Sequence, residues 1–393
     1  MVVLIYYISI MRKVLIVGID TRPVVRSALE LGYEVYSVSY FKAYEVAYDV
    51  DTPLHERFAL SQEEGRSSGV FEEGCTREVL VDLCGDWVDK VDFIIPCTGV
   101  SPRDFPKRKV LGNWNVACIV DKYRFYKRFE NMFNIPLTFK VCDVYDIFDI
   151  RKQYAEYDFI VKPVQGSGGY GIRNLNNLTM DELDHMVCGE WIIQQHIPGE
   201  PISISVLSTK TDTKIITANK QLIGTQQQKE QDYKYTGNIT PYKDLDYQQI
   251  EEKTYTVFQR LKLVGSNGID LINNNGKYYL IEVNPRIQGT FETTEQSYKI
   301  NLLDAHIKAC HGEIIPQPQA QQYSLKQILY TQDRVQVGNL NLPGVHDIPC
   351  PNSILEKNQP LCTLITSNPS LDKVKKINKE KIEKVRNNLT RLH

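Results

Sequence analysis

The sequence has no paired cysteines and no excess of charge of either sign. Its nine cysteines are scattered, their number is odd and none forms a C-x-x-C pair, so a disulfide framework and a zinc site are both disfavoured. A reducing, cytoplasmic setting is the simplest expectation. Lys and Arg number 46 against 48 Asp and Glu, a net charge of −2. This balance carries no general signature of a nucleic-acid or anionic-membrane partner.

The sequence also lacks a long apolar run. Its first ten residues are mostly apolar but too few to span a bilayer. They have no basic start and no small-residue cleavage site, which disfavours a signal peptide, and Met11 competes with Met1 as the true start. With no lipidation motif and no transmembrane run, we expect a soluble protein without a membrane partner.

Alternating strand and helix patterns in the first 118 residues predict an open parallel α/β sheet. The turn after the first strand is not G-x-G-x-x-G, so a dinucleotide fingerprint is absent. Loops 18–23 and 97–105 still follow strand ends, where ligands commonly bind. Arg22 could hold a substrate carboxylate there or be a solvated surface residue, and the polar segment 61–75 is expected to be an exposed loop. The expected elements are strands over 12–17, 34–39 and 92–96 and helices over 24–31 and 79–91.

The chain is organised around the motif E-V-N-P-R that begins at Glu282, at the end of a strand-like apolar run. A period of two places Glu282, Asn284 and Arg286 on one face of an extended segment. Upstream, a short strand carries Asp270, and the turn 273–276 predicts that the two strands form a hairpin. Three oxygen donors would then suit Mg²⁺, or Mn²⁺ in its place, and the arginine would suit phosphate oxygens. Acids on an exposed strand, with no ligand, are the structural alternative.

A second stretch combines a lysine, a proline and a glycine-rich loop. The strand over 159–163 ends in Lys162 and Pro163, and the sequence Q-G-S-G-G-Y-G follows from Gln165. Backbone N–H groups of such a loop can surround phosphates. No Gly-Lys-Ser/Thr closes it, so it is not a Walker loop. A flexible turn is the alternative, but the preceding Lys-Pro favours a phosphate-binding loop.

The middle of the chain predicts further strands. Residues 203–208 and 214–220 are expected to pair as antiparallel strands. The strand over 190–200 runs into a Pro-Gly turn, and its edge could offer backbone groups to an adenine ring. His196 within it is more simply a packed or surface histidine than a catalytic one. Residues 235–241 contain a glycine and are expected to form a loop that closes over a substrate.

These motifs in this order closely resemble the ATP-grasp superfamily of carboxylate ligases, over roughly residues 119–315. The resemblance implies two α+β subdomains that clamp ATP, preceded by an open parallel α/β domain and followed by a small C-terminal domain. The implied divisions are an N-terminal domain over 1–118, a smaller lid subdomain over 119–192, a larger metal-bearing subdomain over 193–315, and a β-rich C-terminal domain with a terminal helix over 316–393.

The resemblance also implies roles at matching positions. Lys122 and Lys162 would contact ATP phosphates, and Arg286 with Lys162 would act in catalysis on the transferred phosphoryl group. The flap over the phosphates would comprise Gly166, Ser167, Gly168, Gly169 and Gly171. The adenine and ribose pocket would be lined by Gln194, Gln195, His196 and Ile197. The metal ligands would be Asp270, Glu282 and Asn284. Many members carry a hinge glutamate where this sequence has two glutamines, and Glu200 lies close by, so the ribose contact stays open.

The implied activity is the ATP-dependent joining of a small-molecule carboxylate to an amine through an acyl-phosphate, with release of ADP and phosphate. The implied cofactors are ATP and Mg²⁺ or Mn²⁺, and homodimers are common among proteins that this chain resembles. The alternatives are a carboxylase or carbamoyl-phosphate-type enzyme, and a non-catalytic nucleotide-binding protein with the same fold. A full carbamoyl-phosphate synthetase is disfavoured because one such constellation fits in 393 residues, and no Met-Lys-Met biotinylation context is present.

Overall fold

The structure is a computed structural model that describes residues 11–44, 52–59, 76–141, 143–187, 190–224 and 233–392. The exposed loop predicted over 61–75 lies outside the described residues, as do the first ten residues. Among the residues that are described, no helix has the length and apolar character needed to cross a membrane.

The N-terminal residues form the open parallel sheet that their alternating pattern predicts. Its strands are β1 (Lys13–Gly18), β2 (Glu34–Ser39), β3 (Leu54–Phe58) and β4 (Phe93–Pro96). They lie in the order β3-β2-β1-β4, and every neighbouring pair is parallel. The helices are α1 (Arg22–Glu30), α2 (Arg77–Cys84) and α3 (Trp87–Lys90), followed by the 3₁₀ helix η2 (Pro102–Asp104). The single helix expected over 79–91 is two helices, because Gly85 adopts a φ of +45° between them.

The segment that follows forms a small antiparallel sheet covered by two helices. Helices α4 (Ala117–Val120) and α5 (Lys122–Phe129) lead into strands β5 (Thr138–Lys140), β6 (Phe159–Pro163), β7 (Arg173–Asn174) and β8 (Trp191–Gln195). Their order is β5-β8-β6-β7. Helices α6 (Val144–Gln153) and α7 (Met180–Val187) and the 3₁₀ helix η3 (Leu175–Asn177) complete the unit. Ile147 and Leu183 of the two helices share a core with Val161 and Ile193 of the sheet.

An eight-stranded antiparallel sheet forms the centre of the molecule, in the order β13-β12-β9-β10-β11-β14-β18-β16. Five of its strands are β9 (Glu200–Ser208), β10 (Thr213–Ile223), β11 (Tyr235–Thr240), β12 (Gly265–Asn274) and β13 (Lys277–Asn284). The accompanying helices are α8 (Tyr247–Leu261), α9 (Phe291–Tyr298) and α10 (Leu302–Cys310). The antiparallel pair predicted over 203–208 and 214–220 is present as β9 and β10.

The loop predicted over 235–241 to close over a substrate is wrong. This segment is strand β11, which pairs with β10 on one side and with β14 (Tyr323–Tyr330) on the other. Gly237 is required for strand packing here, because a Cβ atom at this position would lie 2.0 Å from the carbonyl oxygen of Lys326. The glycine that indicated a loop therefore permits close contact between two strands.

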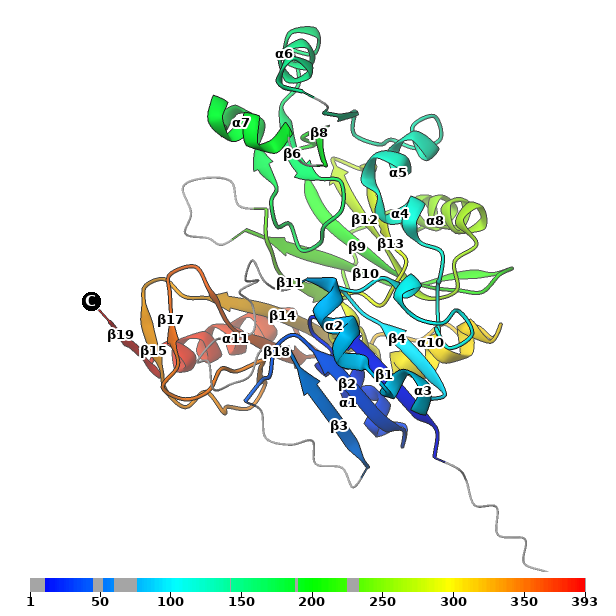
Figure 1. Cartoon of the computed structure of the whole chain (residues 1–393), viewed down its shortest axis with the longest axis vertical. Helices are drawn as coiled ribbons and strands as arrows, with labels where there is room; N and C mark the ends of the chain where they lie inside the picture. The colour runs from blue at the N-terminus through cyan, green and yellow to red at the C-terminus, as the bar shows by residue number, and fades with distance from the viewer. Residues whose placement is uncertain are drawn as a thin grey trace, which may run out of the picture.

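The C-terminal residues contribute to two sheets. Strands β14, β16 (Val345–His346) and β18 (Pro360–Asn368) continue the central sheet. Strands β15 (Val335–Val337), β17 (Ile354–Leu355) and β19 (Leu389–Arg391) form a small sheet of their own, and helix α11 (Leu371–Arg386) packs against β18 and β14. Figure 1 shows the unit of α6 and α7 at one end of the molecule, with the N-terminal sheet and the C-terminal elements side by side at the other.

Three features of the sheets bear on the predicted domain divisions. Strand β8 runs across the division placed between residues 192 and 193, and the central sheet continues past residue 315 into β14. The last strand of the open parallel sheet, β4, ends at Pro96, before residue 118. The divisions themselves stay a prediction.

Candidate active site

One cleft of about 1520 Å³ lies between the small sheet β5-β8-β6-β7, named here the lid sheet, the central sheet and the loops that follow β1 and β4. Almost every site residue predicted from the sequence lines it. The predicted residues on its wall are Lys122, Lys162, Gly166, Ser167, Gly168, Gly169, Gln194, Gln195, His196, Ile197, Glu200, Asp270, Glu282, Asn284 and Arg286. Gly171 is the exception: it is not part of this wall, and a Cβ atom there would meet the Pro163 side chain at 3.1 Å.

The two predicted acidic metal ligands lie directly opposite each other on β12 and β13. Asp270 pairs with Glu282 in the strand register. The turn that joins these strands has positive φ at both Asn275 (+50°) and Gly276 (+85°), as a tight two-residue hairpin requires. Asn284 Nδ2 donates a hydrogen bond to Asp270 Oδ2 at 2.9 Å. The three predicted oxygen ligands are therefore together.

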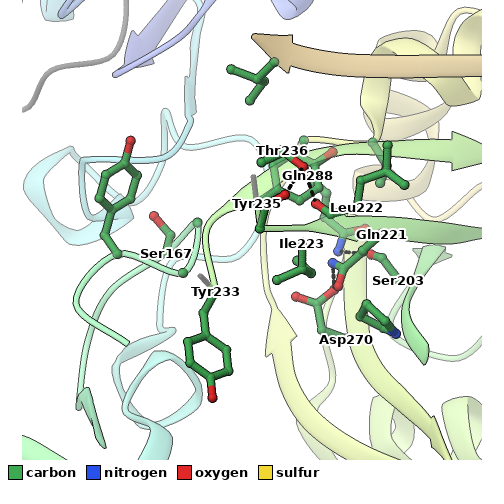
Figure 2. A pocket seen from close by; sticks show the side chains of 18 of the residues that line it. Ser167, Ser203, Gln221, Leu222, Ile223, Tyr233, Tyr235, Thr236, Asp270 and Gln288 are labelled. Atoms are coloured by element: carbon green, nitrogen blue, oxygen red, sulfur yellow. Dashed lines mark hydrogen bonds between the residues drawn. The ribbon is translucent and has the colours of Figure 1, made fainter. Parts of the chain in front are cut away.

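Asp270 is also held by a residue that the sequence did not single out. Gln221 Nε2, from β10, donates to Asp270 Oδ1 at 3.0 Å. Ser203 of β9 lies opposite Asp270 in the register, and Gln288 Nε2 donates to Ser203 Oγ at 3.1 Å. Figure 2 shows Gln221, Ser203 and Asp270 converging on one wall of the cleft. These contacts depend on strand order in the central sheet, for which local sequence carries no signal.

The two carboxylates differ in their electrostatic surroundings. Burial, and then the negative charge of Glu282, raise the pKa of Asp270 to about 7. Burial also acts to raise the pKa of Glu282, but the positive charges of Lys122 and Lys162, followed by an arginine, outweigh it and lower that pKa. Two adjacent carboxylates and an amide oxygen form a donor set that suits a hard divalent cation. A cation placed between them would remove their mutual repulsion.

Among the described residues, the site offers only two acidic side chains as metal ligands. The described part of the chain contains no group of three or more His, Cys, Asp or Glu residues placed to hold a metal ion. Mg²⁺ commonly binds through one or two carboxylates and substrate phosphates, so two acids fit Mg²⁺ carried in with a nucleotide. The residues present therefore fit a metal ion that is coordinated by protein oxygens on one side and by phosphate oxygens on the other.

Three cationic side chains face these acids. Lys122 Nζ lies 3.7 Å from Glu282 Oε2 and donates to the carbonyl oxygen of Gly166 at 3.0 Å. Lys162 is only 2% exposed, and its burial, followed by the charge of Lys122, lowers its pKa to about 7. Burial likewise lowers the pKa of Arg286. Basic side chains beside a carboxylate pair, two of them buried, suit the phosphates of a nucleotide.

The glycine-rich loop contacts the central sheet directly. The amide N–H of Tyr235 on β11 donates to the carbonyl oxygen of Gly168 at 3.0 Å. Gly169 has a φ of +77°, and a Cβ atom there would lie 1.9 Å from the carbonyl oxygen of Tyr233. Glycine at 169 is therefore needed both for the backbone conformation and for the close approach of the loop to the sheet.

The side-chain amides of Gln194 and Gln195, at the end of β8, form hydrogen bonds with residues at or just before the start of the neighbouring strand β5. Gln194 Nε2 donates to Thr138 Oγ1 at 2.9 Å, and Gln195 Oε1 accepts from the Leu137 N–H at 3.3 Å. Glu200 is engaged by Lys220 and Tyr242. Burial acts to raise the pKa of Glu200, but these two hydrogen bonds lower it below its usual value. It is thus an ionised acid on the cleft wall, near the hinge.

Neither prediction for Arg22 is correct. It is buried, with 8% of its side chain exposed, so it is not a solvated surface residue. Its guanidinium binds Glu292 Oε1 and Asp347 Oδ1, each at 2.6 Å, so it is not available to a substrate carboxylate. Lys326 Nζ adds a contact to Glu292 at 3.1 Å. The partners lie more than 250 residues along the chain, and no short sequence motif indicates such a cluster.

A family model of the ATP-grasp domain matches residues 119–290. The chain belongs to the ATP-grasp family. An uncharacterized protein of Methanocaldococcus jannaschii is 31% identical over 376 residues, which are 92% of this chain and 89% of that protein. The ATP-grasp resemblance and the mixed α/β fold expected from the sequence are thereby confirmed.

Two solved structures share the ATP-grasp fold along nearly the whole chain. One is the biotin carboxylase domain of the Hydrogenobacter thermophilus 2-oxoglutarate carboxylase, a dimer in complex with MgADP, ADP and bicarbonate. Its TM-score is 0.69 at 16% identity, with 95% of this chain and 89% of that one covered. The other is the L-amino acid ligase of Bacillus licheniformis, with a TM-score of 0.67, 15% identity, and 97% and 99% covered. At these identities the likeness establishes the fold alone.

Proposed function

We propose that this ATP-grasp protein is an ATP-dependent ligase that joins a small-molecule carboxylate to an amine through an acyl-phosphate, with ADP and phosphate as products. The observation that supports it best is the opposition, in one cleft, of the carboxylates of Asp270 and Glu282 to three basic side chains, Lys122, Lys162 and Arg286. Such an arrangement binds a metal-complexed triphosphate and stabilises the charge that shifts during phosphoryl transfer.

The chain's residues divide this work by position. The backbone of the glycine-rich loop, near Lys122, would surround the phosphates from the lid side. The hinge segment that begins at Gln194 would border the adenine, and the ionised Glu200 is the group placed to accept hydrogen bonds from the ribose. Asp270, Glu282 and Asn284 would hold Mg²⁺, or Mn²⁺ in its place. When bound, this ion neutralises phosphate charge and orients the triphosphate.

The proposed reaction needs no nucleophile from the protein, because the substrates supply both attacking groups. A carboxylate oxygen of the substrate attacks the γ-phosphorus, the bond to the β-phosphate oxygen breaks, and ADP leaves. Arg286 and Lys162 stabilise the phosphoryl oxygens as their charge redistributes. The amine then attacks the acyl carbon, loses a proton, and expels inorganic phosphate. Catalysis by this chain would therefore consist of orientation, charge stabilisation and exclusion of water.

A carboxylase is the second candidate, because the same fold occurs in the biotin carboxylase domain that binds bicarbonate and MgADP. The two activities differ in the acid that is phosphorylated. Bicarbonate alone would serve a carboxylase, whereas a ligase requires an organic acid and an amine. A non-catalytic nucleotide-binding protein is disfavoured because the full set of acids and cations is retained.

The deciding experiment measures ADP release with MgATP against organic acids, each with and without candidate amines, and against bicarbonate. Glu282→Ala removes one proposed metal ligand, and Glu251→Ala, an exposed acid on α8, is the matched control. We expect turnover that needs one acid and one amine, persists in the control and is lost in Glu282→Ala. Turnover with bicarbonate alone would establish the carboxylase instead. MgATP that fails to bind would contradict both.

A further inference from the structure

Two loops of the N-terminal sheet form part of the cleft wall. Asp20 follows β1, and Cys97 and Thr98 follow β4, the strand that neighbours β1. All three line the same cleft as Arg286. Asp20 is an exposed residue, although protein surrounds its carboxylate closely enough to desolvate it. The surface that it exposes is therefore toward the cleft.

The loop that carries Asp20 is held in a defined conformation. The N–H of Ile19 donates to the carbonyl oxygen of Thr98 at 2.7 Å, which joins the two loops. Gly99, with a φ of +104°, packs against the side chain of Ile19. The N–H of Arg22 donates to Asp20 Oδ1 at 3.2 Å. One carboxylate oxygen is thus anchored by backbone, and Asp20 is positioned before any ligand arrives.

The cations near Asp20 are bound to other carboxylates, although Arg22 and Lys326 still act on its charge from a distance. Arg22 is bound to Glu292 and Asp347, and Lys326 is bound to Glu292, so these four groups neutralise one another. Within the described residues Asp20 forms no ion pair. Burial, and then the negative charge of Asp347, raise the pKa of Asp20 to about 6. A cation would find here a carboxylate that is accessible, held in position and without a direct ion pair among the described residues.

Arg286 supplies the opposite charge in the same region. Burial raises the pKa of the Cys97 thiol to about 12, and the charges of Asp20 and Arg286 act on that thiol in opposite directions. The thiol therefore lies within the electrostatic range of both groups. A ligand near Cys97 would meet one unpaired carboxylate and one guanidinium, the pair of charges that a zwitterion satisfies.

We propose that the acid activated by this ligase is an amino acid, whose ammonium group binds Asp20 while its carboxylate lies toward Arg286 and the γ-phosphate. This inference rests on the proposed ligase activity and specifies its acyl substrate. A neutral hydrogen-bond donor could also bind a carboxylate, but it would leave the desolvated negative charge of Asp20 without a direct ion pair, which favours the cation.

The test compares amino acids with the matching acids that lack the amino group. Equilibrium binding is measured by calorimetry on the full chain with MgADP present, and acyl activation by hydroxylamine trapping with MgATP. Asp20→Asn keeps the acceptor for the Arg22 N–H but removes the charge, Asp20→Glu restores charge, and Glu30→Gln on the exposed side of α1 is the control. We expect at least one amino acid to bind about tenfold or more tightly than its matching acid.

The same preference should fall about tenfold or more in Asp20→Asn, recover in part in Asp20→Glu, and persist in Glu30→Gln, while MgADP affinity is unchanged in all. Binding of an amino acid without ATP turnover would support the Asp20 site and contradict the ligase. Turnover of acids lacking an amino group, unaffected by Asp20→Asn, would support the ligase and overturn the Asp20 site. If no acid binds and none is turned over, both are overturned.

Discussion

Asp270 and Glu282 lie directly opposite each other on paired strands, with Asn284 hydrogen-bonded to Asp270. Burial, and then the negative charge of Glu282, raise the pKa of Asp270 to about 7, so ionising both carboxylates in this position is unfavourable. The site therefore stores unfavourable charge that a divalent cation would relieve. The pair of carboxylates that would bind the metal ion lowers the free energy of unfolding of the protein without it. Replacing Asp270 should therefore change activity and stability in opposite directions.

Replacing Asp270 by Asn should stabilise the protein without nucleotide and abolish metal-dependent turnover. Because the pKa of Asp270 is raised above its unfolded value, its ionisation destabilises the folded state, and this loss grows as pH rises from about 4 to about 7. The free energy of unfolding of Asp270→Asn should exceed that of the wild type increasingly over this range. Urea unfolding at several pH values measures it, and a difference independent of pH would contradict the assignment.

Nucleotide binding at pH 8 should take up a proton through Lys162. Its pKa of about 7 leaves it largely neutral at pH 8, and phosphate oxygens would raise that pKa and protonate it. Calorimetry with MgADP in two buffers of different ionisation enthalpy measures the uptake. Asp270 is already ionised at pH 8 and releases little. Lys162→Met should remove the buffer dependence, and an unchanged dependence in that variant would refute the role given to Lys162.

The cluster around Arg22 should be a major source of stability. Arg22→Ala removes the guanidinium that binds both buried carboxylates and leaves Lys326 as the cation in contact with Glu292, so we expect a loss of about 3–5 kcal/mol. Arg26→Ala, on the same helix, breaks only an exposed pair with Glu30 and should cost less than about 1 kcal/mol. Urea unfolding measures both. Equal losses in the two variants would show that the buried cluster is not stabilising.

The same cluster predicts acid sensitivity. Burial acts to raise the pKa of Glu292 and of Asp347, but Arg22 outweighs it, so both pKa values lie below their usual range. A depressed folded-state pKa contributes stability above the unfolded value and loses it as pH falls. The wild type should therefore lose stability below about pH 4.5, and Arg22→Ala should lose less over the same interval. Parallel pH profiles of the two proteins would contradict this origin.

The parts of the site that local sequence could predict are those built by neighbouring residues. The Asn-Gly turn and the period-two pattern placed Asp270 beside Glu282, and the Lys-Pro-glycine segment indicated Lys162 and its loop. The parts it could not predict are built by strand order and distant pairing. Gln221 reaches Asp270 only because β10 lies near β12 in the sheet, and the partners of Arg22 lie on other elements. Gly237 led to a wrong prediction because glycine occurs both in loops and where two strands come into close contact.

Gly169→Ala should impair nucleotide use more than it impairs folding. The added Cβ would lie 1.9 Å from the carbonyl oxygen of Tyr233, so the glycine-rich loop must shift away from the segment that leads into β11. Gly32→Ala is the matched control, because Gly32 has the same φ of +77° with no atom within 4 Å of the added carbon. Both variants should lose about 1 kcal/mol of stability from the backbone conformation alone. Only Gly169→Ala should raise the KM for MgATP, by about tenfold, since a small displacement of phosphate-binding groups is enough to weaken their contacts. Steady-state kinetics with MgATP and thermal unfolding separate the two effects. An equal rise in KM in the control would assign the effect to general destabilisation, whereas a rise confined to Gly169→Ala places the loop at the phosphates.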